Sequence, residues 1–389
     1  MDFTYPAKAE SFRAEIRAWL EINLEPRFRA SPGAHIDPDS EALALALEWN
    51  HRLADAGYGA IAWPPEWGGR NAGVMEQVVF VEEMHRVNAP SSLNPIGLSN
   101  IAPAIIQFGT PEQQQRFLPA MLRGDDIWCQ GFSEPDAGSD LASLKTSAVL
   151  DGDTWIVNGQ KTWNTFGHLA NWCELLVRTD RNAAKHKGIT CLLVDMALLG
   201  VTVRPLMTLT ADNEFNEIFF DDVRVPVEMT LGPPNEGWRV AMTTLAYERG
   251  GVAKLHLGTR AKVAKLIDLA RSTPGRSGDG VMADDPVMRQ HLAQCYLEGE
   301  LLKLVSQRAI SGEIHGRPMG PEGSIAKLVW SETEQHITEV ASDVLGPDAL
   351  HGPWARDRAY ARSFTIAGGT TQINKQIIAQ RILGMPRDR

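Results

Sequence analysis

The spacing of apolar residues changes twice along this chain of 389 residues, and this change restricts the fold more than any other feature. Apolar residues recur at helical spacing from residue 8 to about residue 125. From about 126 to 233 the apolar runs are short, alternate with polar residues and are separated by turns, as in strands. The helical spacing then returns. We therefore predict an α+β, mainly α chain: an N-terminal helical domain at 1–125, a central β-barrel or sandwich at 126–233, and a C-terminal four-helix bundle at 234–389.

Local signals place several boundaries within this outline. Thr110 followed by Pro111 predicts the start of a helix, because threonine caps helices and proline suits the first turn. Asp151-Gly152-Asp153 lies between two alternating runs and predicts a hairpin. We expect Trp63 and Trp67 to pack the loop WPPEWGGRNAG against the core. The stretch from about 234 to 272 is predicted to be one long helix, weakened at Gly250-Gly251.

Composition excludes several classes of function. The net charge of −10 argues against wholesale nucleic-acid binding. The four cysteines form no CxxC pair and do not cluster with histidine, so we predict neither a disulfide framework nor a metal site. The N-terminal segment has no signal-peptide pattern, and no apolar run is long enough to span a membrane. We expect a soluble, cytoplasmic protein.

Three short stretches carry candidate chemistry. CQGFSEPDAGSDLASLKTSAV (129–149) has a glycine turn and two serine hydroxyls, and VNGQKTWNTFG (157–167) contains Trp163. An indole can cover one face of a flat cofactor, although a tryptophan is more often a core residue. FTIAGGTTQINKQI (364–377) places Gly368-Gly369 at a helix entrance, where backbone N–H groups can approach an anion or an oxygen. The alternative for this stretch is a plain turn.

These stretches resemble motifs of the acyl-CoA dehydrogenase family, and the resemblance extends over nearly the whole chain. Four further stretches carry it: WPPEWGG, FGTPEQQQRFLPAMLRGD, DDVRVP and GGTTQINKQIIAQRILG. The resemblance implies the predicted order of domains and a bound FAD. It also implies oxidation of the Cα–Cβ bond of an acyl-CoA to the trans-2-enoyl-CoA. A carboxylate removes the α proton, and hydrogen bonds to the thioester oxygen favour the enolate. Electrons would pass to an electron-transfer flavoprotein.

The resemblance assigns roles by position. Ser133 would bond the flavin edge, Trp163 would pack on the isoalloxazine and Thr165 would lie near flavin N5. Ser139 would contact the pantetheine or thioester end of the substrate. Further cofactor contacts are implied for Thr370, Gln372 and Arg276; the surroundings of Arg276, GRSGDGVMADDP, depart from the family pattern.

The base departs from the commonest family pattern. A glutamate usually precedes G-T-x-Q-I, but Gly368 stands there in this chain. The isovaleryl and long-chain types carry the base on the long helix, directly before an arginine, and Glu248-Arg249 matches that arrangement. We therefore predict Glu248 as the base, Arg249 as a substrate contact, and the N–H of Gly368 as a donor to the thioester oxygen. The alternative is that Glu248 is a solvated helix residue.

Family sites shared between subunits imply a homotetramer, or a heterotetramer with a related subunit. The wording of RTDRNAAKHKGIT and DDVRVPVEM resembles actinobacterial members that process bulky or sterol-derived acyl chains. Two alternatives remain open: a flavin monooxygenase or acyl-CoA oxidase of the same fold, and a non-catalytic FAD-binding subunit of a heteromeric dehydrogenase. The sequence does not identify the acyl chain.

Overall fold

The computed structural model describes residues 5–29, 36–250, 255–276, 278–316 and 320–386. It divides into two compact units, Met1–Glu248 and Arg249–Arg389, which are described separately. In the first unit the helices are α1 (Ala7–Asn23), α2 (Glu41–Asp55), α3 (Val74–Arg86), α4 (Ala102–Phe108), α5 (Pro111–Arg123) and most of α6 (Gly237–Gly250). Its strands are β1 (Trp128–Gly131), β2 (Ser147–Asp151), β3 (Thr154–Lys161), β4 (Trp172–Arg178), β5 (Ile189–Asp195), β6 (Val201–Leu206), β7 (Phe215–Pro226) and β8 (Thr230–Leu231).

The predicted start of α5 is confirmed. The Thr110 hydroxyl accepts a hydrogen bond from the N–H of Gln113, and the Gln113 side chain accepts one from the N–H of Thr110. This reciprocal pair satisfies two N–H groups that the helix itself leaves without partners. The helix ends at Arg123, and the next residue, Gly124, adopts the left-handed conformation that favours glycine.

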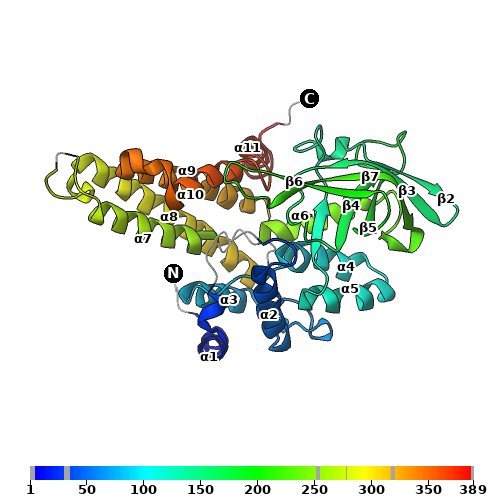
Figure 1. Ribbon diagram of the computed structural model, residues 1–389, viewed down its shortest axis with the longest axis horizontal. Coiled ribbons are helices and arrows are strands. Elements are labelled where there is room, and N and C mark those ends of the chain that lie inside the picture. The colour runs from blue at the N-terminus through cyan, green and yellow to red at the C-terminus, as the bar shows by residue number, and fades with distance from the viewer. Residues whose placement is uncertain (1–4, 30–35, 251–254, 277, 317–319, 387–389) are drawn as a thin grey trace. The chain divides into compact units, whose positions relative to one another are not determined.

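The strands form one sheet in the order β6-β7-β3-β2-β4-β5-β8, and β1 pairs with β4 (Figure 1). The predicted hairpin is confirmed, because Asp151 of β2 pairs with Thr154 of β3 across a two-residue turn. β1 and β4 run parallel, with Trp128 opposite Trp172. Residues at one register position of neighbouring strands lie on the same face of the sheet, so this pairing sets which side chains of β1 and β4 meet.

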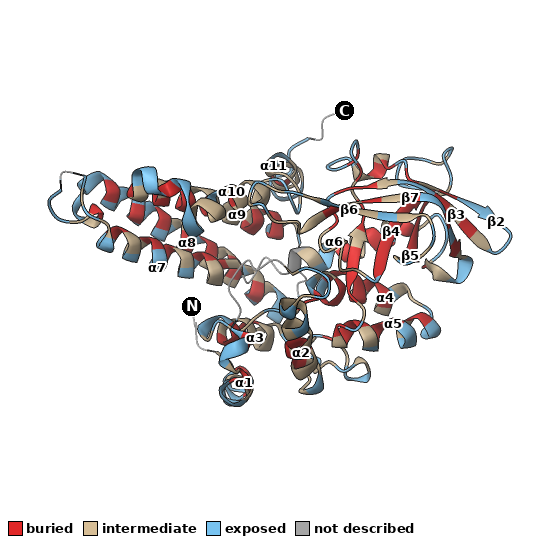
Figure 2. Ribbon diagram, viewed as in Figure 1, coloured by how far each residue is buried: buried red, intermediate tan, exposed pale blue. Residues whose placement is uncertain are grey.

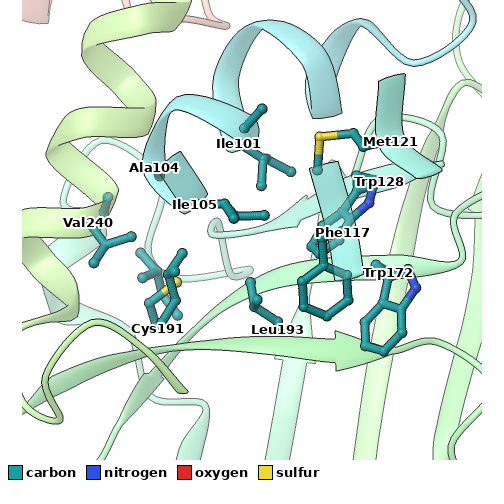
Figure 3. Packing of buried hydrophobic residues seen from close by; sticks show 14 of the residues in the cluster. Ile101, Ala104, Ile105, Phe117, Met121, Trp128, Trp172, Cys191, Leu193 and Val240 are labelled. Atoms are coloured by element: carbon teal, nitrogen blue, oxygen red, sulfur yellow. The ribbon is translucent and has the colours of Figure 1, made fainter. Parts of the chain in front are cut away.

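One core joins the sheet to helices α4, α5 and α6, as Figure 3 shows. Phe117 of α5 packs edge-on against Trp128 and Trp172, with ring centroids 5.2 and 4.8 Å away. On α6, Val240 lies beside Cys191 of β5. Trp63 is buried in this core and Trp67 packs against it, as the sequence predicted. Helix α6 is thereby fixed to β5 along its first turns.

The second unit contains α7 (Leu255–Ser272), α8 (Pro286–Ile314), α9 (Glu322–Leu345), α10 (Gly352–Phe364) and α11 (Thr371–Ile377). Helix α9 packs against α7, α8, α10 and α11, and the apolar core of the bundle includes Leu266, Cys295 and Ile337. Figure 2 shows buried residues along the inner faces of these helices. The single long helix predicted for 234–272 is described as α6 and α7, and residues 251–254 between them lie outside the described residues.

Candidate active site

Two of the candidate stretches lie side by side in the first unit. The N–H of Thr162, just after β3, donates to the carbonyl oxygen of Ser133, just after β1, at 2.9 Å. The side-chain Nδ2 of Asn164 donates to the carbonyl oxygen of Gln130 at 2.6 Å. These bonds run on either side of Trp163, so the structure brings Ser133 and Trp163 together although about 30 residues separate them.

Trp163 is not a core residue. Its side chain is 62% exposed, and its backbone φ is +63°, a conformation that is rare outside glycine. Phe166 in the same turn also has a positive φ, of +56°. The indole contacts the ring of Phe215 edge to face, with the ring centroids 6.1 Å apart. Strained backbone that presents an exposed aromatic side chain is a feature of binding sites. Thr165, two residues further on, is half-buried.

A buried ion pair holds the Ser133 stretch in place. Lys161 is 0% exposed, and its Nζ lies 2.9 Å from Oε1 of Glu134 and 3.1 Å from the carbonyl oxygen of Phe132. The Glu134 carboxylate also accepts hydrogen bonds from the N–H groups of Lys145 and Thr146. Burial raises the pKa of Glu134, but Lys161 and these donors outweigh it and hold the pKa below its usual range. The carboxylate therefore stays charged and fixes both stretches relative to each other.

Two side-chain amides beside the Ser133 and Trp163 stretches have polar atoms that need hydrogen-bond partners. Nε2 of Gln130 and Oδ1 of Asn164 are buried, and neither has a hydrogen-bond partner within the described ranges. An unpaired buried polar group costs about 1–3 kcal/mol, so a ligand that pairs with it is favoured. A flavin ring has donors and acceptors along its edge and a flat face for Trp163. These residues fit an isoalloxazine.

Ser139 lies elsewhere on the same stretch. It is exposed, and it directly precedes Asp140, which bonds Lys185 at 2.6 Å and Ser143 at 2.7 Å. These contacts fix the turn in which Ser139 lies. The structure leaves the Ser139 side chain accessible to a ligand.

Glu248 occupies the last turn of α6 and is half-buried. One turn earlier, Thr244 is fully buried and donates to the carboxyl of Glu174 on β4, at 2.8 Å. The side chain of Arg249 lies outside the described residues. Glu248 belongs to the first unit and Gly368 to the second.

The turn between α10 and α11 contains Gly368 and Gly369, with φ of +63° and +88°. Both values are in the region that favours glycine, which explains the pair. Nζ of Lys327, a buried residue of α9, donates to the carbonyl oxygens of Phe364 and Gly369, each at 2.7 Å. Thr370 caps α11 by accepting from the N–H of Ile373. The stretch is thus an ordered turn in which Gly368 is exposed.

The remaining predicted residues lie in the second unit. Gln372 is an exposed residue in the first turn of α11. Arg276 is exposed in the loop after α7, and its Nη2 donates to the carbonyl oxygen of Asp343 at 3.2 Å. Gln372 and Arg276 therefore belong to a different unit from Ser133 and Trp163.

A separate open pocket lies in the first unit. None of the predicted site residues lines it. Two partly buried carboxyls, Asp126 and Asp195, do, and burial raises the pKa of Asp126 against the opposing effect of Arg116. Its lining residues are Asp126, Gly167, His168, Ala170, Asn171, Trp172, Asp195, Met196, Ala197 and Val203. In the part of the chain that the structure describes, no group of three or more metal-binding side chains is placed to hold an ion.

Comparison with known proteins identifies the family. The profiles named acyl-CoA dehydrogenase N-terminal, middle and C-terminal domain match residues 6–125, 129–223 and 235–383, in that order. The acyl-CoA dehydrogenase IpdE1 of Mycobacterium tuberculosis is 40% identical over 388 residues, covering 97% of this chain and 98% of IpdE1. The chain belongs to the acyl-CoA dehydrogenase family. The predictions of family, of an oxidoreductase and of an acyl-CoA dehydrogenase activity are therefore confirmed at this level.

Solved structures support the same fold for this acyl-CoA dehydrogenase. The Tcur3481-Tcur3483 steroid ACAD, where ACAD stands for acyl-CoA dehydrogenase, matches with a TM-score of 0.86 and 28% identity over 100% of both chains. A chain of the ChsE4-ChsE5 complex from Mycobacterium tuberculosis matches with a TM-score of 0.83 and 30% identity, again over 100% of both. The predicted fold class is confirmed. None of the helices in the described part of the chain combines the length and apolar character of a membrane span.

Sequence reasoning missed four residues of this dehydrogenase that contact a candidate stretch or the helix that carries Glu248. They are Gln130, Glu174, Thr244 and Lys327. Gln130 and Glu174 are polar residues inside buried apolar strands, and this unusual placement could have marked them as candidates from the sequence. Lys327 lies in a helix among small and apolar neighbours, but its carbonyl partners are 37 and 42 positions away. No local pattern reveals such a contact.

Proposed function

We propose that this chain is an FAD-dependent enzyme that converts an acyl-CoA thioester to the trans-2-enoyl-CoA and passes electrons to an electron-transfer flavoprotein. Its family membership supports the reaction. The observation that carries the proposal within the structure is the exposed, strained Trp163 beside Ser133. It is flanked by amide atoms of Gln130 and Asn164 that have no hydrogen-bond partner among the described residues. The bound flavin would supply hydride acceptance from Cβ.

These residues would bind and orient that flavin. Trp163 would offer a flat face to the ring, and Ser133 and Thr165 would offer hydroxyls to its edge. Gln130 and Asn164 would offer a donor and an acceptor. Glu134 and Lys161 hold these stretches rigidly, so the site is formed before a ligand enters. Thr370, Gln372 and Arg276 would complete the cofactor site from the C-terminal unit or from a neighbouring subunit.

Glu248 would remove the α proton as general base. Its position on α6 before Arg249 supports this role, and Gly368 leaves no carboxyl at the commoner position. The α C–H is acidic enough only when the thioester oxygen is stabilised as the enolate develops. The N–H of Gly368 would donate to that oxygen, and Lys327 holds the turn that presents it. Ser139 and Arg249 would bind the CoA portion.

The acyl group is proposed to be bulky and steroid-derived. The matched steroid ACAD supports this class. Ile366 and Ala367 precede Gly368, where the commoner family pattern has a tyrosine, and they would reshape the acyl pocket. A substrate of this class has a rigid ring system that a pocket of small and aliphatic side chains can accommodate.

We also propose that the chain assembles as a tetramer, with itself or with a related subunit. The ChsE4-ChsE5 complex is a two-component relative. In this chain, α8 has an exposed apolar stripe formed by Leu297, Leu301 and Leu304, each more than half exposed. Their spacing of four and three residues places them on one face of the helix. An apolar stripe of this kind is buried when helices of two subunits pack together. The cytoplasmic location stays a prediction.

The experiment that tests the proposed reaction is a screen of acyl-CoA thioesters, from four carbons to steroid-sized, with a ferrocenium acceptor. We expect turnover with bulky thioesters and slow reoxidation of the reduced flavin by air. Rapid reoxidation by air would favour an oxidase or monooxygenase. No turnover by the chain alone, restored by a related partner chain, would identify a subunit of a heteromeric enzyme.

A further inference from the structure

Glu174 is a buried carboxyl that the proposed mechanism does not use. It lies in β4, is 0% exposed and is surrounded by an apolar core. Thr244 donates to its Oε1 at 2.8 Å, and the Cys191 thiol lies 3.9 Å from the same atom. Its other oxygen, Oε2, is buried without a hydrogen-bond partner among the residues that the structure describes. A charged carboxylate in such a place would be costly.

The position of Glu174 is set by strand register. Glu174 of β4 is the direct partner of Gln130 of β1, so both side chains lie on one face of the sheet. This is the face that packs against α6, where Val240 lies beside Cys191 (Figure 3). The Glu174 carboxyl therefore lies between Gln130 of β1, a residue of the proposed flavin site, and α6, the helix that contains Glu248.

Thr244 connects this carboxyl to the proposed base. Residues four apart on a helix lie on the same face one turn apart, and Thr244 precedes Glu248 by four. Thr244 is completely buried, so its contact with Glu174 is shielded from water. Beyond Glu248, the described part of α6 ends at Gly250. The turn of α6 directly before the base is thus bound to Glu174.

We propose that Glu174 is a positioning residue of the dehydrogenation: through Thr244, its carboxyl fixes the turn of α6 that places Glu248. This inference rests on the proposed function, in which Glu248 is the base. Misplacement of a reacting group by about 1 Å can cost about a hundredfold in rate. A tether one turn from the base is therefore kinetically important even though it does not touch the substrate.

The groups around Glu174 decide how the tether depends on pH. Burial raises the pKa of Glu174 to about 8, partly offset by the hydrogen bonds from Thr244 and Cys191. Burial also raises the pKa of the Cys191 and Cys173 thiols well above its usual value, so both stay neutral. β1 contributes the neutral amide of Gln130. Ionisation of Glu174 would place a new charge in this core, in contact with Thr244, the residue one turn before Glu248.

The test compares two threonines of α6 by stopped-flow bleaching of the flavin, with the acyl-CoA thioester that bleaches the wild-type flavin fastest. Thr244→Val removes the donor with little change in shape. Thr243→Val is the matched control, because Thr243 donates to the carbonyl oxygen of Arg239 within the same helix. We expect Thr244→Val to lower the rate constant at saturating substrate about 10- to 100-fold, with unchanged substrate affinity and a normal rate in the control.

The conservative variant Glu174→Gln keeps an acceptor for Thr244 but cannot ionise. Glu174→Gln should retain most of the wild-type rate at pH 7, and its pH profile should differ from that of the wild type around pH 8, where only the wild-type carboxyl ionises. Hydrogen exchange at residues 241–248 should be faster in Thr244→Val than in Thr243→Val. Loss of thermal stability in Thr244→Val with wild-type rates and an unchanged pH profile in both variants would overturn the proposal.

Wild-type enzyme and Glu248→Gln are measured in the same series. If no thioester bleaches the wild-type flavin, or if Glu248→Gln bleaches it normally, the proposed function fails and this inference fails with it. If both behave as proposed and only the Thr244 and Glu174 variants match their controls, the inference alone is wrong.

Discussion

Nζ of Lys327 lies 2.7 Å from the carbonyl oxygen of Gly369, and the same oxygen accepts a second hydrogen bond from Nδ2 of Asn374, also at 2.7 Å. Glycine has the largest conformational freedom of the amino acids, so a turn of two glycines without further contacts would be mobile. The buried lysine removes that freedom at Gly369. The backbone of Gly368 is then held in one conformation, which its proposed role as a hydrogen-bond donor requires.

Lys327→Met should lower the thermal midpoint of unfolding. The change removes the Lys327 donor from the carbonyl oxygen of Phe364, while the carbonyl oxygen of Gly369 keeps its hydrogen bond from Asn374. A buried polar group left unsatisfied costs about 1–3 kcal/mol. Differential scanning calorimetry is the measurement. Lys375→Met, at an exposed lysine of α11, serves as control and should leave the midpoint within about a degree. Equal midpoints for the two variants would show that Lys327 does not hold the turn.

Trp163→Ala should weaken FAD retention and change the flavin absorbance bands, while stability of the apoprotein stays close to wild type. The reason is that the indole is 62% exposed and contributes little to the core. Trp163→Phe, which keeps a flat ring, should retain most of the affinity. FAD titration followed by fluorescence measures both. Unaltered affinity and spectrum in Trp163→Ala would remove this residue from the flavin site.

Glu174→Gln should make the protein more stable at pH 8 than the wild type, with a smaller difference at pH 5. The folded pKa of Glu174 is about 8, above its usual value of 4.5. Below pH 4.5 the carboxyl is protonated in both states, and its contribution to stability is fully present. Between 4.5 and 8 only the unfolded state releases the proton, so stability falls by up to about 1.4 kcal/mol per pH unit.

Thermal unfolding at pH 5, 6, 7 and 8 measures this difference. Glu66→Gln, at an exposed carboxyl of the same unit, controls for the change in net charge. A difference between Glu174→Gln and wild type that is the same at every pH would mean that Glu174 does not hold a proton in the folded protein.

Leu301→Lys should dissociate the assembly that we propose. A charge in the middle of the exposed apolar stripe of α8 would have to be buried without a partner when two subunits pack. Leu301→Met, which keeps the surface apolar, should assemble normally. Light scattering of both variants, alone and with a related chain, gives the result. A wild-type protein that is a monomer with full FAD occupancy would contradict the shared site.

The sequence predicted the succession of helical and β regions because apolar periodicity is a local property, repeated over many residues. It also located Trp163 and the turn at Gly368, where the wording of short motifs is unusual. Residue spacing and composition did not predict the exposure of Trp163, since tryptophan is normally buried and the positive φ of its turn depends on contacts with Gln130 and Ser133.

Glu174 and Lys327 show what local patterns omit. Glu174 interrupts an apolar strand, and a lone acid there is equally compatible with an exposed strand edge. Only the pairing of β1 with β4 and the packing of α6 show that it is buried and bound to Thr244. Lys327 looks like any helical lysine until the fold brings the turn at Gly369 to it. Both roles depend on contacts between distant segments.

The measurement that tests the central claim most directly is anaerobic stopped-flow bleaching of the flavin in Glu248→Gln with a cognate acyl-CoA. General-base catalysis accounts for roughly 10²–10⁴-fold in rate, so we expect the bleaching rate to fall at least that far while FAD binding survives. The double change Glu248→Gly with Gly368→Glu should recover part of the lost rate, because family members place the base at either position. Bleaching at the wild-type rate in Glu248→Gln would contradict the account, because it would show that Glu248 is not the base.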